Sequence, residues 1–318
     1  MLKYFLSFLA LIGQAYSLEV NSSYMNNYVK YLKEYNKEFF YDNFLTFKNN
    51  TDLVQKHNEE NHSYNLEINY LSDQKISFNP IIYQPSNSLY QGEDENTTPP
   101  FSIDWREKDV ISDVKNQGRC GSCWSFSATG AMEGAWAIST GKLVSLSEQQ
   151  LVDCSKSYGN HGCYGGLMDG AFNYAMENSM CAEDAYPYTA SGGDCEGCQP
   201  VVTISDCSDV TPNNQVDLKS AVSIGPVSIA IEADTREFQL YTSGVITGDA
   251  CGTDLDHGVL IVGYGEGGTT HNEPPYWIVK NSWGPSWGDN GYVLIERSDS
   301  TNDPGVCGIA MQPSFPVV

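Results

Sequence analysis

The sequence predicts an α+β protein in which a mainly helical part precedes a mainly β part. From Trp124 to Ile138, apolar or small residues recur at alternating steps of four and three, which marks one face of a helix. From about residue 215 onward, short apolar or alternating runs are separated by Gly, Pro and Asn, as is typical of strands. Residues 18–98 differ from both parts, because they hold none of the ten cysteines.

The first 17 residues have the pattern of a secretory signal peptide. Lys3 supplies a positive end, Tyr4–Ile12 is an apolar run too short to span a membrane, and Ala15 and Ser17 are small enough for a cleavage site. A buried N-terminal strand is the alternative. The cysteines fit a signal peptide, because disulfides persist in the oxidising compartments to which it leads. We therefore expect the chain to enter the secretory pathway.

The chain is long enough for two or three folding units, with 318 residues, and it is strongly acidic. It contains 17 Lys and Arg against 40 Asp and Glu, a formal net charge of −23. Nucleic acids and anionic membrane surfaces attract basic proteins, so neither is an expected partner. Residues 18–98 and the rest of the chain are both acidic. Hydrophobic and local contacts, rather than gross electrostatics, must therefore hold the two parts together.

Cys123 lies where the helix that includes Trp124 should begin. Gly118 and Gly121 precede it and suit a loop that turns sharply. The free N–H groups and the dipole at a helix N-terminus favour a negative charge, and they lower the pKa of a cysteine placed there. The stretch Gln117–Ser127 therefore predicts a nucleophilic thiolate. The alternative is that Cys123 is one half of a disulfide.

Two later stretches supply a base and the group that orients it. Asp256–Gly265 contains His257, and Tyr276–Gly284 contains Asn281. A cysteine nucleophile needs a general base held in place by a third group. The three motifs, in the order Cys, His, Asn, resemble those of the papain family of cysteine proteases, and in particular its cathepsin L-like branch. The resemblance covers nearly the whole chain after the signal sequence.

The resemblance implies a two-lobe fold that is preceded by a helical propeptide. A helical left lobe would pack on a β-barrel right lobe, with the active-site cleft between them. Residues 1–17 would be the signal peptide, 18–98 the inhibitory propeptide and 99–318 the peptidase domain. Asp104–Arg106 resembles the start of a mature enzyme. Residues 87–100, just before it, are rich in Gly, Pro, Asn and acid, as a protease-cut linker should be.

The expected propeptide matches its family pattern only in part. Four positions of its long helix match by spacing: Phe47, Asn50, Val54 and Asn58. Phe40 and Phe44, however, stand where the family has a Glu and an Arg, so we expect an apolar substitute for a salt-bridged helix crossing. A second motif is matched in part at Asn69, Leu71 and Asp73. Four N-glycosylation sequons also fall in this part or in the linker: Asn21, Asn49, Asn61 and Asn96.

The resemblance gives each catalytic residue a role. Cys123 would attack the peptide carbonyl, and His257 would stabilise the thiolate and then protonate the departing amine. Asn281 would fix the second imidazole nitrogen, and Trp283 would shield that bond from water. Gln117 would join the Cys123 backbone N–H in an oxyanion hole. Each residue taken alone has a structural alternative: a loop Gln, a buried His, a turn Asn or a core Trp.

Three other functions are alternatives. Cys120 and Cys123 have the spacing of a redox pair, and Cys195 and Cys198 repeat it. Two such pairs could also hold zinc if they converged, but they lie far apart in the chain, so we expect neither a metal nor a cofactor. A disulfide oxidoreductase would keep its thiol exchange after loss of the His and the Asn. A catalytically silent binding or storage relative would have a substituted catalytic position, and none is substituted.

The family's disulfides can be carried over to six cysteines. The implied pairs are Cys120–Cys163, Cys154–Cys195 and Cys251–Cys307, and Cys123 stays free. Three cysteines remain without a family partner: Cys181, Cys198 and Cys207. We expect one further bridge among them, with Cys198–Cys207 as the first choice, and one thiol left over.

Substrate-binding residues follow from the same alignment. Gly165 and Gly166 belong to a strand that resembles the one pairing with the substrate backbone, where glycine allows close approach. The implied pocket for the P2 side chain, two residues before the cut bond, is apolar: Leu167, Met168, Ala230, Leu255 and Gly258, with Gln312 at its far end. We therefore expect Leu, Phe or a similar residue at P2. No inserted loop after Cys163 blocks the cleft, so an endopeptidase is favoured.

The expected partners are protein and peptide substrates and the chain's own propeptide, which would act as an inhibitor. We expect a monomer. Its destination would be a lysosome-like acidic vacuole or the extracellular space. Acid would loosen the propeptide by protonating its carboxylates, and the enzyme would then cut the linker near Pro99.

Overall fold

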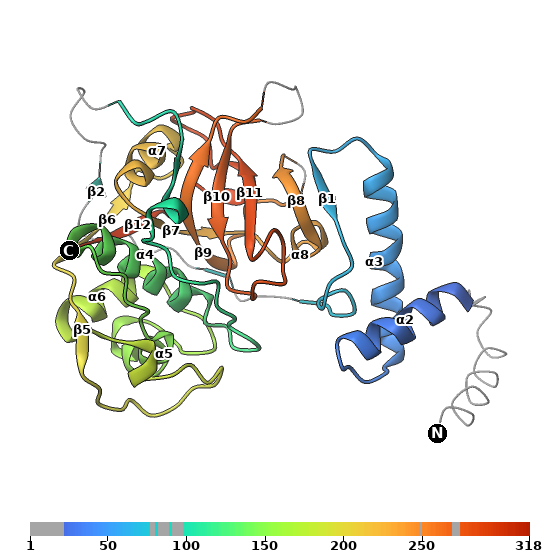
Figure 1. Ribbon diagram of the computed structural model, residues 1–318, viewed down its shortest axis with the longest axis horizontal. Coiled ribbons are helices and arrows are strands. Elements are labelled where there is room, and N and C mark those ends of the chain that lie inside the picture. The colour runs from blue at the N-terminus through green and yellow to red at the C-terminus, as the bar shows by residue number, and fades with distance from the viewer. Residues whose placement is uncertain (1–21, 77–79, 82–88, 91–97, 249, 269–273) are drawn as a thin grey trace.

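The computed structural model describes residues 22–318, apart from 77–79, 82–88, 91–97, 249 and 269–273. The expected signal peptide, two of the sequons and most of the expected linker lie outside these residues. The described chain forms a helical lobe, a β lobe and an N-terminal segment that lies against the far side of the β lobe (Figure 1). The order of the two lobes is the one that the sequence predicts.

Seven α-helices fall within the described residues. The N-terminal segment contains α2 (Ser22–Glu34) and α3 (Tyr41–Glu59). The helical lobe contains α4 (Cys123–Thr140), α5 (Glu148–Cys154) and α6 (Met168–Asn178). The β lobe carries α7 (Gln215–Ile224) and the short α8 (Arg236–Gln239).

Helix α4 is the central helix of the helical lobe. It begins at Cys123, as the sequence predicts, and ends at Gly141, whose left-handed backbone (φ 73°) lets its N–H reach the carbonyl of Ala137. The predicted apolar face is buried over the first three turns, but Ile138 in the last turn is 39% exposed. The helix packs against α6 and against strand β9 of the other lobe.

Twelve strands are described, and ten of them form one mixed sheet. Hydrogen bonds order nine of these as β1-β8-β11-β10-β9-β7-β12-β6-β2, with β3 on β9, while β4 and β5 pair separately. The end strands β1 and β2 both precede residue 99. In the described part of the chain, the expected barrel is thus a sheet with two ends. The strands are β1 (Tyr64–Leu66), β2 (Leu89–Tyr90), β3 (Ile103–Asp104), β4 (Met180–Cys181), β5 (Pro200–Val202), β6 (Asp206–Val210), β7 (Val227–Ile231), β8 (Tyr241–Ile246), β9 (His257–Gly265), β10 (Tyr276–Lys280), β11 (Tyr292–Glu296) and β12 (Ser314–Val317).

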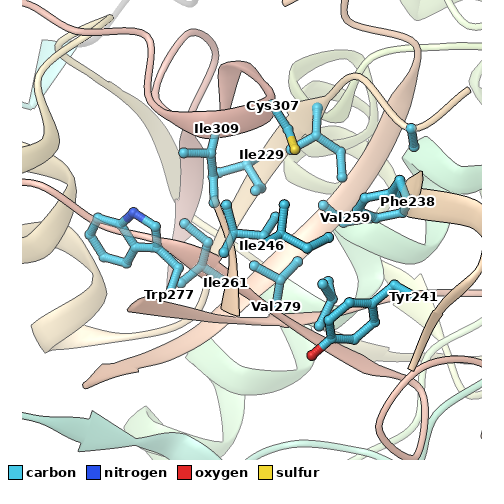
Figure 2. Packing of buried hydrophobic residues seen from close by; sticks show 14 of the residues in the cluster. Ile229, Phe238, Tyr241, Ile246, Val259, Ile261, Trp277, Val279, Cys307 and Ile309 are labelled. Carbon is cyan, nitrogen blue, oxygen red and sulfur yellow. The ribbon is translucent and has the colours of Figure 1, made fainter. Parts of the chain in front are cut away.

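The β lobe is held by one large apolar core. Side chains from β7, β9 and β10 meet in it, including Ile229, Ile261 and Val279, as Figure 2 shows. Strands β7 and β9 are buried along their whole length, which explains why their sequences are nearly continuous apolar runs. This core gives β9 and β10 a fixed position, and the candidate site lies at one end of these two strands.

The N-terminal segment has its own aromatic cluster where α2 crosses α3. Phe44 is buried there with its ring 5.5 Å from that of Tyr28, so the expected apolar substitute exists at this position. Phe40 does not take part, because it is 57% exposed. A salt bridge is present nearby but comes from other residues, since Lys37 Nζ lies 2.5 Å from Asp73 Oδ1. The same carboxylate also accepts hydrogen bonds from two tyrosines, Tyr28 and Tyr31.

Backbone pairing attaches the N-terminal segment to the β lobe. Strand β1 runs antiparallel to β8 with Tyr64 opposite Gly244, and Leu66 enters the large β-lobe core. Gly244 has φ +85°, and a Cβ there would lie 2.3 Å from the carbonyl oxygen of Ser63. This glycine is therefore required for the close approach of the two chains. Farther on, Tyr70 donates a hydrogen bond to the carbonyl of Trp283 (3.1 Å).

Four disulfides are present in the structure. Three join the pairs implied by the family resemblance: Cys120–Cys163, Cys154–Cys195 and Cys251–Cys307. The fourth joins Cys181 to Cys198, so the expected Cys198–Cys207 bridge is wrong and Cys207 is the thiol left over. The antiparallel pairing of β4 with β5 explains the difference, because Cys181 lies opposite Pro200 there and its Cα comes within 6.2 Å of that of Cys198.

Replacing Gly244 with alanine should loosen the N-terminal segment. The added methyl group would meet the backbone of Ser63, so the amide of Glu67, which bonds to Leu240, should exchange its hydrogen about tenfold faster or more. Hydrogen-exchange mass spectrometry would measure this. Gly159→Ala is the matched control, since Gly159 also has positive φ but no atom within 4 Å of a new Cβ. Equal protection in both variants would contradict a steric role for Gly244.

Candidate active site

Cys123 is the first residue of α4 and is held against β9 of the other lobe. A Cβ on Gly258 would lie 3.1 Å from the Cα of Trp124, so only glycine allows this approach without a shift of the backbone. Ser127 on the next turn donates to the carbonyl of Val259 (2.6 Å). These contacts bring the residue that follows His257 to the N-terminus of α4, where the backbone N–H of Gly258 lowers the pKa of the Cys123 thiol.

His257 and Asn281 form a buried pair. Their Nε2 and Oδ1 atoms are 2.7 Å apart. The backbone N–H of Ser282 also donates to that Asn281 oxygen (2.8 Å), which fixes the amide so that its oxygen faces the imidazole. The histidine Nε2 therefore carries the hydrogen in the neutral ring, and Nδ1 is the nitrogen left to exchange a proton elsewhere.

Trp283 covers this pair from one side. Its ring centroid is 4.9 Å from that of His257, and the indole is 4% exposed. Phe238 and Trp287 pack edge-on against the same indole. The tryptophan is thus fixed by the β-lobe core and keeps water from the hydrogen bond between the imidazole and the amide.

Gln117 is buried between the lobes with both ends of its amide engaged. Its Oε1 accepts a hydrogen bond from Ser282 Oγ (2.7 Å), and its Nε2 donates to the carbonyl of Cys120 (3.0 Å). The sequence analysis did not identify Ser282, although its position directly after Asn281 could have indicated that it lies in the site. It also missed Tyr188, whose hydroxyl donates to the Gln117 carbonyl (2.8 Å) and lies 2.5 Å from Ser122 Oγ.

Burial shifts the pKa values of Cys123 and His257 toward their neutral forms. It raises the pKa of the Cys123 thiol to about 11, although the backbone N–H groups of Gly258 and Trp124 lower it. Burial also lowers the pKa of His257 to about 4, against the effect of its bond to Asn281. Desolvation thus acts against the thiolate that the helix N-terminus favours.

A buried polar layer lies beneath the site, between α4 and strands β9 and β10. Lys115 bridges two carboxylates from the helical lobe, Glu133 (3.0 Å) and Glu148 (2.7 Å). Lys280 from β10 donates to the carbonyl of Ser112 (2.7 Å). A cavity of about 20 Å³, room for about one water molecule, separates these groups from Asn281. Lys280 therefore connects the β lobe to Ser112, which in turn donates to Glu133 of the helical lobe.

Most of the expected P2-pocket residues meet in one apolar cluster. Met168, Ala230 and Leu255 are buried together beside Trp124, and a Cβ on Gly258 would lie 3.3 Å from the sulfur of Met168. Leu167 immediately precedes α6 and is only half-buried. Met311, which sequence reasoning missed, packs on the same cluster. Gln312 is half-buried beside it.

Both glycines of the expected substrate strand disfavour a side chain, Gly165 through its backbone conformation and Gly166 through lack of space. Gly165 has φ +114°, a conformation that L side chains rarely adopt. A Cβ on Gly166 would lie 2.5 Å from Asn160 Oδ1 and 2.7 Å from the ring of Trp124. Cys163, which precedes this stretch, is joined to Cys120 and accepts a hydrogen bond from Gly121 N–H (2.9 Å). The stretch is therefore held beside the loop that leads into Cys123.

One residue of the N-terminal segment reaches the P2 cluster. The backbone N–H of Ile81 donates to the carbonyl of Leu255 (2.8 Å), and its side chain packs on the cluster that contains Met168 and Ala230. An apolar side chain from outside the two lobes thus already lies against the expected pocket.

The cysteines of the two C-x-x-C pairs are engaged separately. Cys120, Cys195 and Cys198 each form a disulfide with a residue outside the pair, which leaves Cys123 without a redox partner at that spacing. In the described part of the chain, no three His, Cys, Asp or Glu residues come together as a metal site would require. Among the same residues, no helix is both long and apolar enough to cross a membrane.

Comparison with known proteins gives consistent matches. Residues 99–317 match the family described as papain family cysteine protease. The chain is 44% identical over 295 residues to cysteine proteinase EP-B 1 of Hordeum vulgare, across 86% of this chain and 78% of that protein. Its structure is similar to the proform of the Amb a 11 cysteine protease, a major ragweed pollen allergen (TM-score 0.84, 37% identity, 94% of this chain and 87% of that one). It is also similar to digestive procathepsin L 3 of the Tenebrio molitor larval midgut (TM-score 0.80, 36% identity, 93% and 99%).

Alkylation of Cys123 should be slow in the intact chain. Because burial raises the pKa of this thiol, little thiolate is present at pH 7, and the rate should climb as the pH rises toward about 11. Iodoacetamide labelling followed by peptide mapping would measure it. Removal of the N-terminal segment should speed labelling of Cys123 at pH 7 by about tenfold or more. The buried Cys207 serves as an internal reference in the intact chain only, because its strand β6 loses its neighbour β2 when the N-terminal segment is removed. Fast labelling of Cys123 in the intact chain at pH 7 would contradict this account.

Proposed function

The chain belongs to the papain family of cysteine proteases, and from this premise we propose that it is the proenzyme of a cathepsin L-like endopeptidase in which residues 18–98 inhibit residues 99–318. The observation that carries the proposal is the arrangement around Cys123. The cysteine begins a helix, the residue after His257 lies against that helix, and Asn281 holds the imidazole at 2.7 Å. The similarity to two protease proforms supports the assignment of the N-terminal segment as a propeptide.

In the proposed mechanism, Cys123 gives its proton to Nδ1 of His257 and attacks the carbonyl carbon of the scissile bond. Nε2 of the histidine keeps its bond to Asn281, so the imidazolium is held in one orientation while Nδ1 passes the proton to the leaving amine. Water then hydrolyses the acyl-enzyme, with the same histidine as base. The ion pair is favoured by a less desolvated site than the one described here, and we propose that departure of the propeptide provides it.

Gln117 is the proposed side-chain donor of the oxyanion hole. Its Nε2 bonds to a backbone carbonyl in this structure, while Ser282 holds its Oε1, so the amide nitrogen is already directed toward the loop before Cys123. The developing oxyanion would compete for that nitrogen together with the Cys123 backbone N–H. Loss of one such donor typically slows catalysis by roughly 10²–10³-fold.

The P2 preference is proposed from the apolar cluster. Met168, Ala230 and Leu255 offer no charged partner, so a P2 side chain such as Leu or Phe gains free energy by burial there. The position of Ile81 supports this proposal, because a branched apolar residue of the propeptide covers the same cluster. Gly165 and Gly166 would pair with the substrate backbone.

The proposed route of the protein through the cell is inferred from the sequence. The apolar N-terminus would direct the chain into the secretory pathway, where the four disulfides could form and the sequons could be glycosylated. The destination would be an acidic vacuole or the extracellular space, and the enzyme would act as a monomer on proteins and peptides. Neither a cofactor nor a metal has a place in the proposed reaction.

Self-processing tests the proposed function directly. The purified precursor, mildly reduced and acidified, should lose mass with time and give a product that begins near Pro99, because the active enzyme cuts the exposed linker. Intact-mass spectrometry would follow this beside a Cys123→Ala control, which should stay whole. If neither protein changes, a little active protease should be added and a peptide substrate assayed. Continued inactivity would then indicate a silent relative.

Gln312→Glu should raise the rate of cleavage of substrates that carry Arg at P2. A carboxylate at the far end of an apolar pocket would offer the guanidinium a charged partner that an amide cannot. The ratio of kcat/KM for Arg-Arg and Leu-Arg substrates of equal length should increase by about tenfold. Met311→Glu is the comparison, since Met311 is the neighbour that packs on the cluster. An unchanged ratio in Gln312→Glu with a raised ratio in Met311→Glu would assign the far end of the pocket to Met311.

A further inference from the structure

The last turn of α3 holds the strand that attaches the propeptide to the enzyme. Nε2 of the buried His57 donates to the carbonyl of Tyr64 (3.0 Å). The neighbouring Asn58 makes two bonds to Leu66, to its carbonyl (2.8 Å) and from its N–H (3.0 Å). Two consecutive helix residues therefore occupy the outer edge of β1.

The inner edge of β1 is occupied by the enzyme. Ser63 accepts a bond from the N–H of Val245 (2.9 Å), and Glu67 donates to the carbonyl of Leu240 (2.8 Å). Among the described residues this short strand pairs with no strand but β8, so its order depends on both edges. If the bonds to α3 are lost, β1 becomes more mobile and its pairing with β8 weakens.

A second imidazole lies directly on His57. The rings of His57 and His62 stack with their centroids 4.0 Å apart and their planes 7° from parallel, and the ring of Tyr64 lies 4.4 Å from that of His57. His62 in turn bonds to Glu60 Oε2 (2.9 Å). Two of the five histidines in the chain thus face each other at the point where the propeptide docks.

The charged groups around His57 come from both parts of the protein. Glu60 and His62 belong to the propeptide, with Lys56 close to Glu60, and Glu237 belongs to helix α8 of the enzyme. None of these carboxylates forms a salt bridge or hydrogen bond with His57 itself among the contacts of the described residues. A proton added to this ring would therefore enter a buried, stacked position without a direct counter-ion.

We propose that the stacked pair His57 and His62 is an acid-sensitive latch, and that protonation of His57 releases β1 from the enzyme and starts activation. The proposal rests on the proposed function, since it names how the same site is regulated. It differs from the carboxylate trigger expected from the sequence, because histidine responds in a higher pH range than a carboxylate does.

The direction of the effect follows from linkage. Burial lowers the pKa of His57 in the docked state, with the nearby His62 acting in the same direction. Once β1 has separated from α3 in the undocked propeptide, the ring is exposed and returns to its ordinary pKa of about 6.5. Above that pH both states are neutral and docking is fully stable. Below it the undocked state binds a proton that the docked state does not, so docking weakens until the pH reaches the docked pKa.

The experiment uses the full-length chain with Cys123→Ala, so that self-cleavage cannot contribute to the measured hydrogen exchange. Hydrogen-exchange protection of the Glu67 and Val245 amides, corrected for intrinsic exchange, should fall about tenfold or more between pH 7.5 and 5. His57→Gln keeps a neutral donor for the Tyr64 carbonyl, so its protection should change less than about threefold. His161→Gln, at an exposed histidine of the enzyme, should behave like the parent.

Two further variants distinguish the histidine pair from a carboxylate as the acid-sensitive group. His62→Gln removes the second imidazole, which helps to lower the pKa of docked His57. The fall in protection between pH 7.5 and 5 should therefore be smaller than in the parent but larger than in His57→Gln, and this variant tests the pair even if His57→Gln folds poorly. Asp73→Asn tests the carboxylate trigger. The proposal is overturned if His57→Gln and His62→Gln both titrate like the parent, and in particular if Asp73→Asn alone abolishes the transition.

Self-processing of the chain with an intact Cys123 separates this inference from the proposed function. The pH at which cutting begins should move down by about one unit in His57→Gln. Loss of protection without any cutting would support the latch and contradict the proposed protease activity. If the parent and His57→Gln were cut with the same pH dependence, the latch would be contradicted and the protease activity supported.

Discussion

The contact between the first turn of α4 and strand β9 is the constraint on which the site depends. Gly258 has no side chain because the backbone of Trp124 occupies that space, and Ser127 ties the next turn to the same strand. One element carries the cysteine and the other the histidine. A shift between them would separate the two groups even if each lobe stayed folded. The hydrogen bond from Lys280 of β10 to Ser112 supports the same alignment.

The burial that positions these groups also suppresses their ionisation. A helix N-terminus favours a thiolate, but desolvation acts more strongly and favours the neutral thiol and imidazole. Ile81 of the N-terminal segment packs on the apolar cluster that contains Met168 and Ala230, so this segment also contributes to closing that cluster from water.

The N-terminal segment is attached mainly by backbone and apolar contacts, which suits two acidic parts. It supplies both end strands of the large sheet, β1 beside β8 and β2 beside β6. Gly244 allows one of these approaches, and the histidine pair lies on the other edge of β1. The attachment through β1 therefore depends on a few residues.

The sequence by itself determined the features that depend on local pattern and on motifs. These are the helix that begins at Cys123, the change from helical to β periodicity, and the residues that meet at the site. Only the tertiary structure decided which residues pair when several residues of the same chemical type are available. Cys181 rather than Cys207 pairs with Cys198, because the β4–β5 register brings their Cα atoms within 6.2 Å. Lys37 pairs with Asp73, and Met311 joins the pocket cluster, for the same reason: distances between remote segments are set by packing, and periodicity carries no information about them.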